Sequence, residues 1–136
     1  MNTVTERNHA EENAKAHMES IIELIDKLDG GTIDGEELDC DQIQERIQES
    51  ILDVEVRTDW HSPGDDDNKP TEYLILLSTG GPACRVIGDL DSYCQPTNAK
   101  LEYQDWGTPW TRYYNNMTDE DDEKLLLYAS QFYFGE

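Results

Sequence analysis

The hydrophobic positions in the first part of the chain repeat with the period of an α-helix. Over Glu11–Leu28 the apolar residues fall three and four positions apart, which predicts an amphipathic helix that ends at Gly30-Gly31. A second apolar stripe predicts a helix from about Asp34 to Ser50 with a polar opposite face. The two stripes consist of Ala14, Met18, Ile21, Ile22, Ile25 and Leu28, and of Cys40, Ile43, Ile47 and Ile51.

After Leu52 the period changes from 3.6 to 2, the period of a strand. Val54–Trp60 alternates apolar or uncharged residues with charged ones, which predicts a half-buried strand, and the apolar run Tyr73–Leu77 predicts a central strand. Two further strands are predicted at Cys84–Leu90 and Lys100–Trp106, joined by turn-forming residues. Four consecutive strands with short connections predict an antiparallel meander.

A C-terminal helix completes the predicted fold. Thr118 is the predicted N-cap, and the acidic residues after it suit the positive end of the helix dipole. The predicted class is therefore α+β, with two N-terminal helices, a four-stranded antiparallel sheet and a C-terminal helix, in the order α-α-β-β-β-β-α. The length of 136 residues predicts one domain over 1–136, with an acidic helical part at 1–52 and the sheet with the last helix at 53–136.

The charge balance adds a functional expectation to this fold. The chain has 31 Asp and Glu residues against 10 Lys and Arg residues, a formal net charge of −21. This is far beyond the magnitude of about 2 to 8 that suits the solubility of a small domain. The excess indicates a basic partner, metal ions or a high-salt setting. Because like charges repel, direct nucleic-acid binding and a membrane surface are not expected, and no apolar run reaches the roughly 18 residues of a membrane span.

A row of acidic residues on the second predicted helix is the main candidate for the partner-binding surface. Glu37, Asp41, Glu45 and Glu49 recur at i+4 and would lie about 6 Å apart along one ridge. Like charges at this spacing destabilise a helix by a few tenths of a kcal/mol per pair, and only Arg46 is close enough to relieve them. Such a line of charge can imitate the phosphates of a nucleic acid and occupy a groove lined by Lys and Arg. The alternative is an ordinary solvated helix face.

Two further segments are candidates for partner binding. Asp65, Asp66 and Asp67 form an acidic cluster in a predicted loop beside the ridge. Trp110 is predicted in another loop, where it is either an exposed aromatic anchor for an interface or a residue packed on the sheet.

The segment between the two predicted helices resembles a calcium-binding EF-hand loop over 12 residues. Asp26, Asp34 and Glu37 would take ligand positions 1, 9 and 12 of such a loop. Positions 3 and 5 are Leu28 and Gly30, which have no side-chain oxygen, and no second loop is present for pairing. A plain turn between two helices is therefore the favoured interpretation, and no cofactor is predicted.

Features of an enzyme are weak in this sequence. Ser78-Thr79-Gly80-Gly81 lacks the Lys of a phosphate-binding loop, and no spacing fixes an approach between His61 and Cys84. The three cysteines are an odd number without a C-x-x-C spacing, which predicts reduced thiols, and the first residues do not resemble a signal peptide. We therefore expect a cytoplasmic protein without catalytic activity.

The second half of the chain, from Val54–Trp60 through Leu101–Trp110 to Gln131–Glu136, resembles small acidic accessory proteins carried by phages and plasmids. The resemblance implies an anti-defence role, as an anti-CRISPR or antirestriction inhibitor whose acidic surface blocks the DNA-binding groove of a host nuclease complex. It carries over no functional residue. The leading hypothesis is DNA mimicry directed at a basic, nucleic-acid-binding host protein. The alternatives are an immunity or antitoxin-like protein that neutralises a basic nuclease, and a calcium-responsive module.

Overall fold

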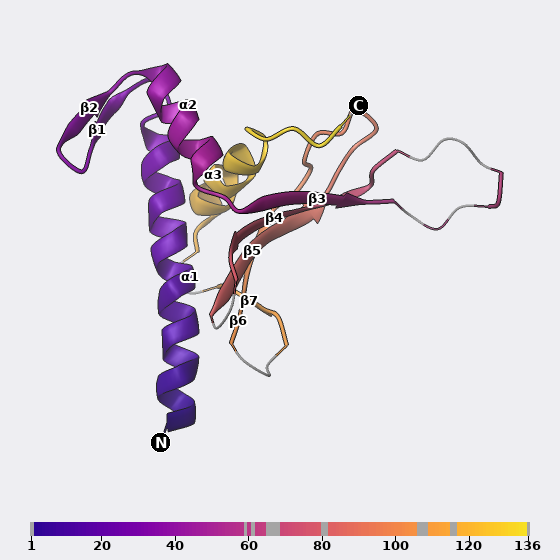
Figure 1. Ribbon diagram of the computed structural model, residues 1–136, viewed down its shortest axis with the longest axis horizontal. Coiled ribbons are helices and arrows are strands. Elements are labelled where there is room, and N and C mark those ends of the chain that lie inside the picture. The colour runs from indigo at the N-terminus through magenta and orange to yellow at the C-terminus, as the bar shows by residue number, and fades with distance from the viewer. Residues whose placement is uncertain are drawn as a thin grey trace.

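The described residues form three helices and two antiparallel sheets. The computed structural model describes residues 2–58, 60, 62–64, 69–79, 82–105, 109–114 and 117–135, with side chains from Ala10 onward. Sheet one pairs β1 with β2, and sheet two has the order β3-β4-β5-β6-β7. The elements are α1 (Asn2–Asp26), β1 (Gly31–Ile33), β2 (Glu36–Leu38), α2 (Cys40–Glu49), β3 (Asp53–Arg57), β4 (Glu72–Ser78), β5 (Ala83–Asp89), β6 (Lys100–Gln104), β7 (Thr111–Arg112) and α3 (Asp119–Ala129) (Figure 1).

A β-hairpin stands where the second predicted helix was expected to begin, so the predicted order α-α-β-β-β-β-α is wrong. Asp34 and Gly35 have φ values of +52° and +80°, and Ile33 pairs directly with Glu36 across them. Positive φ at both central residues is the geometry of the two-residue turn that joins antiparallel strands, and Asp-Gly is one of the pairs that adopt it most readily. A right-handed helix cannot contain these conformations.

Helix α2 begins at Cys40, after a capping box that stops it from extending back into the hairpin. The Asp39 side chain accepts a hydrogen bond from the Gln42 amide at 2.9 Å, and the Gln42 side chain accepts one from the Asp39 amide at 2.9 Å. These two bonds satisfy backbone donors that have no partner at a helix start.

The main sheet has five strands in place of the four that were predicted. The additional strand, β7, pairs Arg112 with Glu102 and Thr111 with Tyr103 of β6. Two residues are too short to produce a detectable alternation, so the sequence pattern did not reveal this strand. All neighbouring strands are antiparallel, and the element order is α-β-β-α followed by five strands and α3.

The hydrophobic core lies between the three helices and one face of the five-stranded sheet (Figure 1). Tyr73, Ile75 and Leu77 alternate along β4 towards the helices, whereas the residues between them are partly exposed. Since a one-residue slip would turn this buried set outward, the core also fixes the strand register. Full burial of each large apolar side chain contributes about 1.5–3 kcal/mol. The largest fully buried side chains are Tyr128, Ile43, Ile47, Ile75, Leu101, Leu125, Val86 and Cys84.

Polar contacts connect the helices to one another at defined points. Lys124 of α3 places its Nζ 2.8 Å from Asp26 Oδ1 of α1 and 3.5 Å from Glu120 Oε1. Ser50, at the end of α2, shares a 2.6 Å hydrogen bond with the buried Tyr128 hydroxyl of α3. These contacts hold α2 and α3 in the positions from which their outer faces meet solvent.

Candidate acidic interaction surface

Helix α2 presents an acidic row to solvent, formed by Asp41, Glu45 and Glu49. All three residues are exposed, whereas Ile43 and Ile47 between them are completely buried in the core. Positions four apart lie on one side of a helix and rise about 6 Å along its axis. We refer to these three residues as the α2 acidic row.

Glu37 is exposed but lies on strand β2, so the predicted four-residue ridge on a single helix is wrong. Strand geometry replaces the helical spacing before Asp39, and Glu37 therefore does not continue the row. The hairpin contacts α2 through Glu36, because Arg46 Nη2 of α2 lies 2.9 Å from Glu36 Oε2. Arg46 was expected to relieve the repulsion within the row and instead bonds to the hairpin.

The bases of the helical layer whose side chains the structure describes are engaged by acidic residues outside the α2 acidic row; they are Lys15, Lys27, Arg46 and Lys124. Lys15 lies 4.0 Å from Glu19, and Lys27 lies 4.0 Å from Glu23. Lys124 bonds to Asp26, and this contact is the main cause that raises the pKa of its ammonium. Within the part of the chain that the structure describes, no base forms an ion pair with a residue of the α2 acidic row.

The outer face of the five-stranded sheet, which the helices do not cover, is nearly balanced in charge. Register places five acids and four bases of the described strands there, and several stand directly opposite each other, such as Arg85 with Glu102. The negative excess of the described residues is therefore concentrated on the helical side and the hairpin. The bases of the outer face are Arg57, Arg85, Lys100 and Arg112, and the acids are Asp53, Glu55, Glu72, Asp89 and Glu102.

Trp110 belongs to this outer face and is half-buried. The Arg85 Cζ lies 4.0 Å from the centroid of a Trp110 ring, and Arg85 Nη2 is 2.7 Å from Glu102 Oε1. Stacking of a guanidinium on an aromatic face is a favourable contact that holds the ring against the sheet. The structure thus does not bring Trp110 together with the α2 acidic row, because they lie on opposite sides of the sheet. Asp65, Asp66 and Asp67 lie outside the described residues.

The segment that resembles an EF-hand loop does not fold as one. Asp26 is the last residue of α1, Asp34 lies in the hairpin turn and Glu37 lies on β2. The helix–loop–helix arrangement that gathers calcium ligands is therefore replaced by a helix and a hairpin. Among the described residues no group of three or more His, Cys, Asp and Glu side chains is placed to hold a metal ion.

Two other features of the described residues bear on chemistry. A pocket of about 340 Å³ lies over the outer face of the sheet, where Arg57, Arg85 and Lys100 alternate with acidic side chains. Burial raises the pKa of the Cys84 thiol to about 12, which disfavours the thiolate that a nucleophilic cysteine requires. His61, for which no spacing fixed an approach to Cys84, lies outside the described residues.

Comparison of the chain with protein-family models, with curated proteins and with solved structures gave no match. Within the described residues, no helix combines the length and the apolar character needed to cross a membrane. Function is therefore inferred from the distribution of charge and of exposed side chains.

Proposed function

We propose that this protein binds the basic, nucleic-acid-binding surface of another protein through the α2 acidic row and thereby keeps nucleic acid away from that surface. The observation that supports the proposal is the division of charge. Asp41, Glu45 and Glu49 are exposed and have no ion pair with a described base. The bases of the helical layer whose side chains are described instead pair with other acidic residues.

The cost of keeping the row gives a physical reason for a basic partner. Like charges at i+4 destabilise an isolated helix by about 0.2–0.5 kcal/mol per pair. A groove lined by Lys and Arg relieves this repulsion and releases the counterions that both surfaces hold in the free state. Since exposed ion pairs contribute about 0.2–1 kcal/mol each, three new pairs would strengthen binding by about 3-fold to about 140-fold.

The biological setting that we propose is inhibition of a host defence nuclease, of the anti-CRISPR or antirestriction type. The resemblance of residues 54–136 to acidic accessory proteins of phages and plasmids supports this setting, and the net charge of −21 is consistent with DNA mimicry. Free DNA should not bind the protein, since both are polyanions.

The experiment is an affinity capture from a bacterial host lysate that has been treated with nuclease to remove bridging nucleic acid. The bait is compared with the variant that carries Asp41→Lys, Glu45→Lys and Glu49→Lys. Three reversals change the net charge by six, from −21 to −15. We expect the unmodified protein to capture a basic nucleic-acid-binding protein at low salt, less of it at high salt, and the variant to capture little at either.

A control variant with the same net charge separates the α2 acidic row from overall acidity. Glu12→Lys, Asp29→Lys and Glu123→Lys change three exposed acids that have no ion pair among the described residues. Circular dichroism spectra of both variants verify the fold. Equal loss of capture by the two variants would assign binding to net charge and not to the row. Absence of any basic nucleic-acid-binding protein among the captured proteins would refute the proposed function.

A further inference from the structure

Strand β3 has the sequence pattern of a half-buried strand but is exposed on both faces. Val54 and Val56 point to the same side as the buried residues of β4. Val54 is only partly buried, however, and Val56 is 44% exposed. Leu52 and Trp60, which flank the strand, are 61% and 104% exposed. The helical layer therefore leaves much of this apolar row uncovered.

The uncovered strand is also an edge of the sheet. β3 pairs with β4 on one side and is the first strand in the sheet order, whereas the opposite edge is the two-residue strand β7 (Figure 1). The Arg57 carbonyl accepts a hydrogen bond from the Thr71 amide at 2.9 Å, so it points towards the β4 side. Backbone groups of alternate residues point to opposite sides of a strand. The N–H and C=O groups of Val54 and Val56 therefore point away from β4, towards the open edge. There the Val54 amide donates to Asp53 Oδ1 of its own strand at 2.9 Å, a bond that pairing with a second strand would replace.

The side chains of β3 are complementary to a second copy of the same strand. We propose that β3 pairs antiparallel with β3 of a second copy, centred on Glu55, to form one continuous sheet across two molecules. In this register Asp53 faces Arg57 of the second copy and Val54 faces Val56 of the second copy, and each pairing occurs twice. Opposite charges and β-branched residues are favourable cross-strand pairs. The single like-charge pair is Glu55 with Glu55, on the two-fold axis.

Other registers of the same two strands fit less well. Parallel alignment in register places each of the charged residues opposite itself. A shift by one residue places charged side chains opposite valines, on the wrong face. Antiparallel shifts by two residues leave only three residues of each strand paired. The register centred on Glu55 also aligns the outward backbone groups of Val54 with those of Val56, which gives the hydrogen bonds of two complete pairs.

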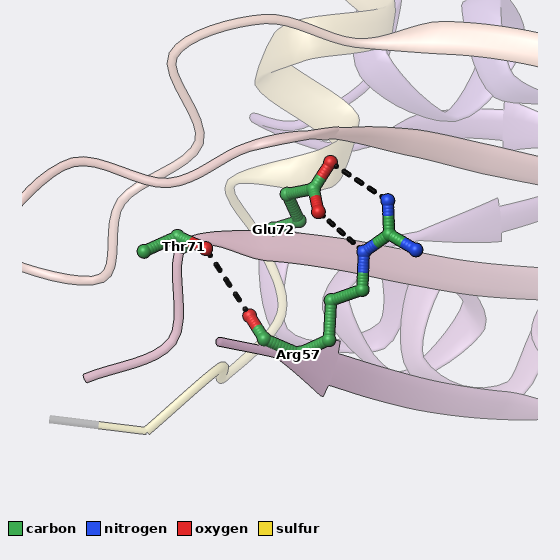
Figure 2. A network of polar contacts seen from close by, with 3 residues as sticks. All are labelled: Arg57, Thr71 and Glu72. Carbon is green, nitrogen blue, oxygen red and sulfur yellow. Dashed lines mark hydrogen bonds and ion pairs between the residues drawn. The ribbon is translucent and has the colours of Figure 1, made fainter. Parts of the chain in front are cut away.

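Hydrogen bonds within its own sheet order the Arg57 side chain before any contact with a second copy. Its Nη2 donates to Glu72 Oε1 at 3.1 Å, and its Nε donates to Glu72 Oε2, which fixes the guanidinium over the outer face (Figure 2). This fork is the first cause that lowers the pKa of the Glu72 carboxyl. In the register centred on Glu55, Asp53 of the second copy lies opposite this guanidinium, and carboxylates are its preferred acceptors. Ordering before contact reduces the entropy that pairing costs.

Charged side chains on an edge strand commonly prevent indiscriminate pairing with other strands. In β3 the order of the charges, acidic at Asp53 and Glu55 and basic at Arg57, prevents most pairings but favours the self-pairing described above. An interface of two five-residue strands is much smaller than the about 800 Å² per partner of a standard complex. We therefore expect weak dimerisation, with a dissociation constant on the order of 100 μM.

Disulfide trapping tests the register directly. In a Cys40→Ser background, in which the remaining cysteines Cys84 and Cys94 are buried, Glu55→Cys places two thiols on the two-fold axis. Opposed residues of a non-hydrogen-bonded antiparallel pair have Cα atoms about 4.5 Å apart, within the range of a disulfide. We expect rapid cross-linking to a dimer on mild oxidation. The control Glu37→Cys, exposed on β2, should cross-link only at the rate of random collision.

Sedimentation equilibrium at up to 500 μM protein, on the order of five times the expected dissociation constant, measures the same association without a cross-link. Val56→Pro removes an N–H that points to the open edge and leaves the bonds to β4 in place, so it should abolish dimerisation without changing the circular dichroism spectrum. Glu55→Gln removes the like-charge pair and should strengthen dimerisation several-fold. The proposal is overturned if Glu55→Cys cross-links no faster than Glu37→Cys, or if Val56→Pro folds and dimerises like the unmodified protein. Neither outcome depends on the function proposed above.

Discussion

The hydrogen bond between Ser50 and Tyr128 predicts an asymmetric response to mutation. Ser50 Oγ lies 2.6 Å from both the Ile47 carbonyl oxygen and the Tyr128 hydroxyl. A serine has one hydroxyl hydrogen, and the carbonyl can only accept, so Ser50 donates to Ile47 and accepts from Tyr128. Tyr128 is completely buried, and burial is the main cause that raises the pKa of its hydroxyl to about 12. Its donor has no route to water if Ser50 is removed.

The two single substitutions should therefore differ in cost. Tyr128→Phe removes one hydrogen bond, and Ser50 keeps its bond to Ile47, so the free energy of unfolding should fall by about 0.5–1.5 kcal/mol. Ser50→Ala leaves the Tyr128 hydroxyl buried without an acceptor and should cost about 1–3 kcal/mol. In Ser50→Ala the Ile47 carbonyl still accepts a hydrogen bond from the backbone amide of residue 50, which is 3.1 Å long in the unmodified protein. Once Ser50 is alanine, adding Tyr128→Phe should be neutral or stabilising, because the unsatisfied donor disappears.

Urea denaturation followed by circular dichroism measures all four proteins of this double-mutant cycle. In a thermal denaturation of the same proteins, each kcal/mol would shift the melting temperature of a domain of this size by about 3 °C. A larger cost for Tyr128→Phe than for Ser50→Ala would refute the assignment of Ser50 as the acceptor for the buried Tyr128 hydroxyl. An equal cost of Tyr128→Phe in the Ser50→Ala background and in the unmodified protein would also refute it, since the two residues would then be uncoupled.

Two further predictions concern close packing and pH. Gly88→Ala would place a Cβ 2.2 Å from a backbone carbonyl oxygen of the β5–β6 connection, so we expect the free energy of unfolding in a urea titration to fall by more than about 2 kcal/mol. The control Gly31→Ala should cost less, because the nearest neighbour of its Cβ is a flexible lysine side chain. Equal costs for the two substitutions would contradict the clash at Gly88. Burial lowers the pKa of His17 below its ordinary value of 6.5. The unfolded chain therefore binds a proton at His17 more readily than the folded chain does, so the contribution of His17 to stability is lost as pH falls below 6.5. The stability of the unmodified protein relative to His17→Gln should therefore decrease from pH 7 to pH 5, and a difference that is constant over this range would contradict the prediction.

Periodicity predicted the elements whose burial is regular. The apolar spacing of Met18, Ile21 and Ile25 predicted a helix, and these residues are buried in α1. The run Tyr73–Leu77 predicted a central strand, and it lies within β4 between two other strands. These segments could be predicted because each buries one continuous face, so the core imposes its period on the sequence.

The hairpin was missed because two patterns overlap in the same residues. Asp34-Gly35 is a strong turn signal, but the helix predicted from the apolar stripe that begins at Cys40 was extended back to Asp34, and the i+4 spacing of Glu37 and Asp41 agreed with that extension. The capping box at Asp39, which decides the boundary, depends on a reciprocal side-chain contact that residue spacing only suggests. The error changed the candidate site, because it removed one of the four residues from the helical row.

Ion-pair partners and edge positions could not be read from the sequence. Arg46 is within one turn of the α2 acidic row, yet it bonds to Glu36 on the hairpin, a contact that exists only after the hairpin has folded back on α2. Similarly, the alternation of β3 predicts an apolar face but not whether helices reach it. Whether Val56 is covered depends on where the helical layer ends, which is a property of the tertiary structure.

Among the described residues, the unequal division of charge between the two sides of the sheet amounts to a dipole moment. Near a positively charged surface this dipole exerts a torque that turns the acidic helices towards the surface before any atoms touch. Such orientation raises the fraction of productive collisions, and its effect decays over a screening length of about 8 Å at physiological ionic strength. The outer face of the sheet, with Arg85 and Trp110, then points away from the positively charged surface and stays open to solvent.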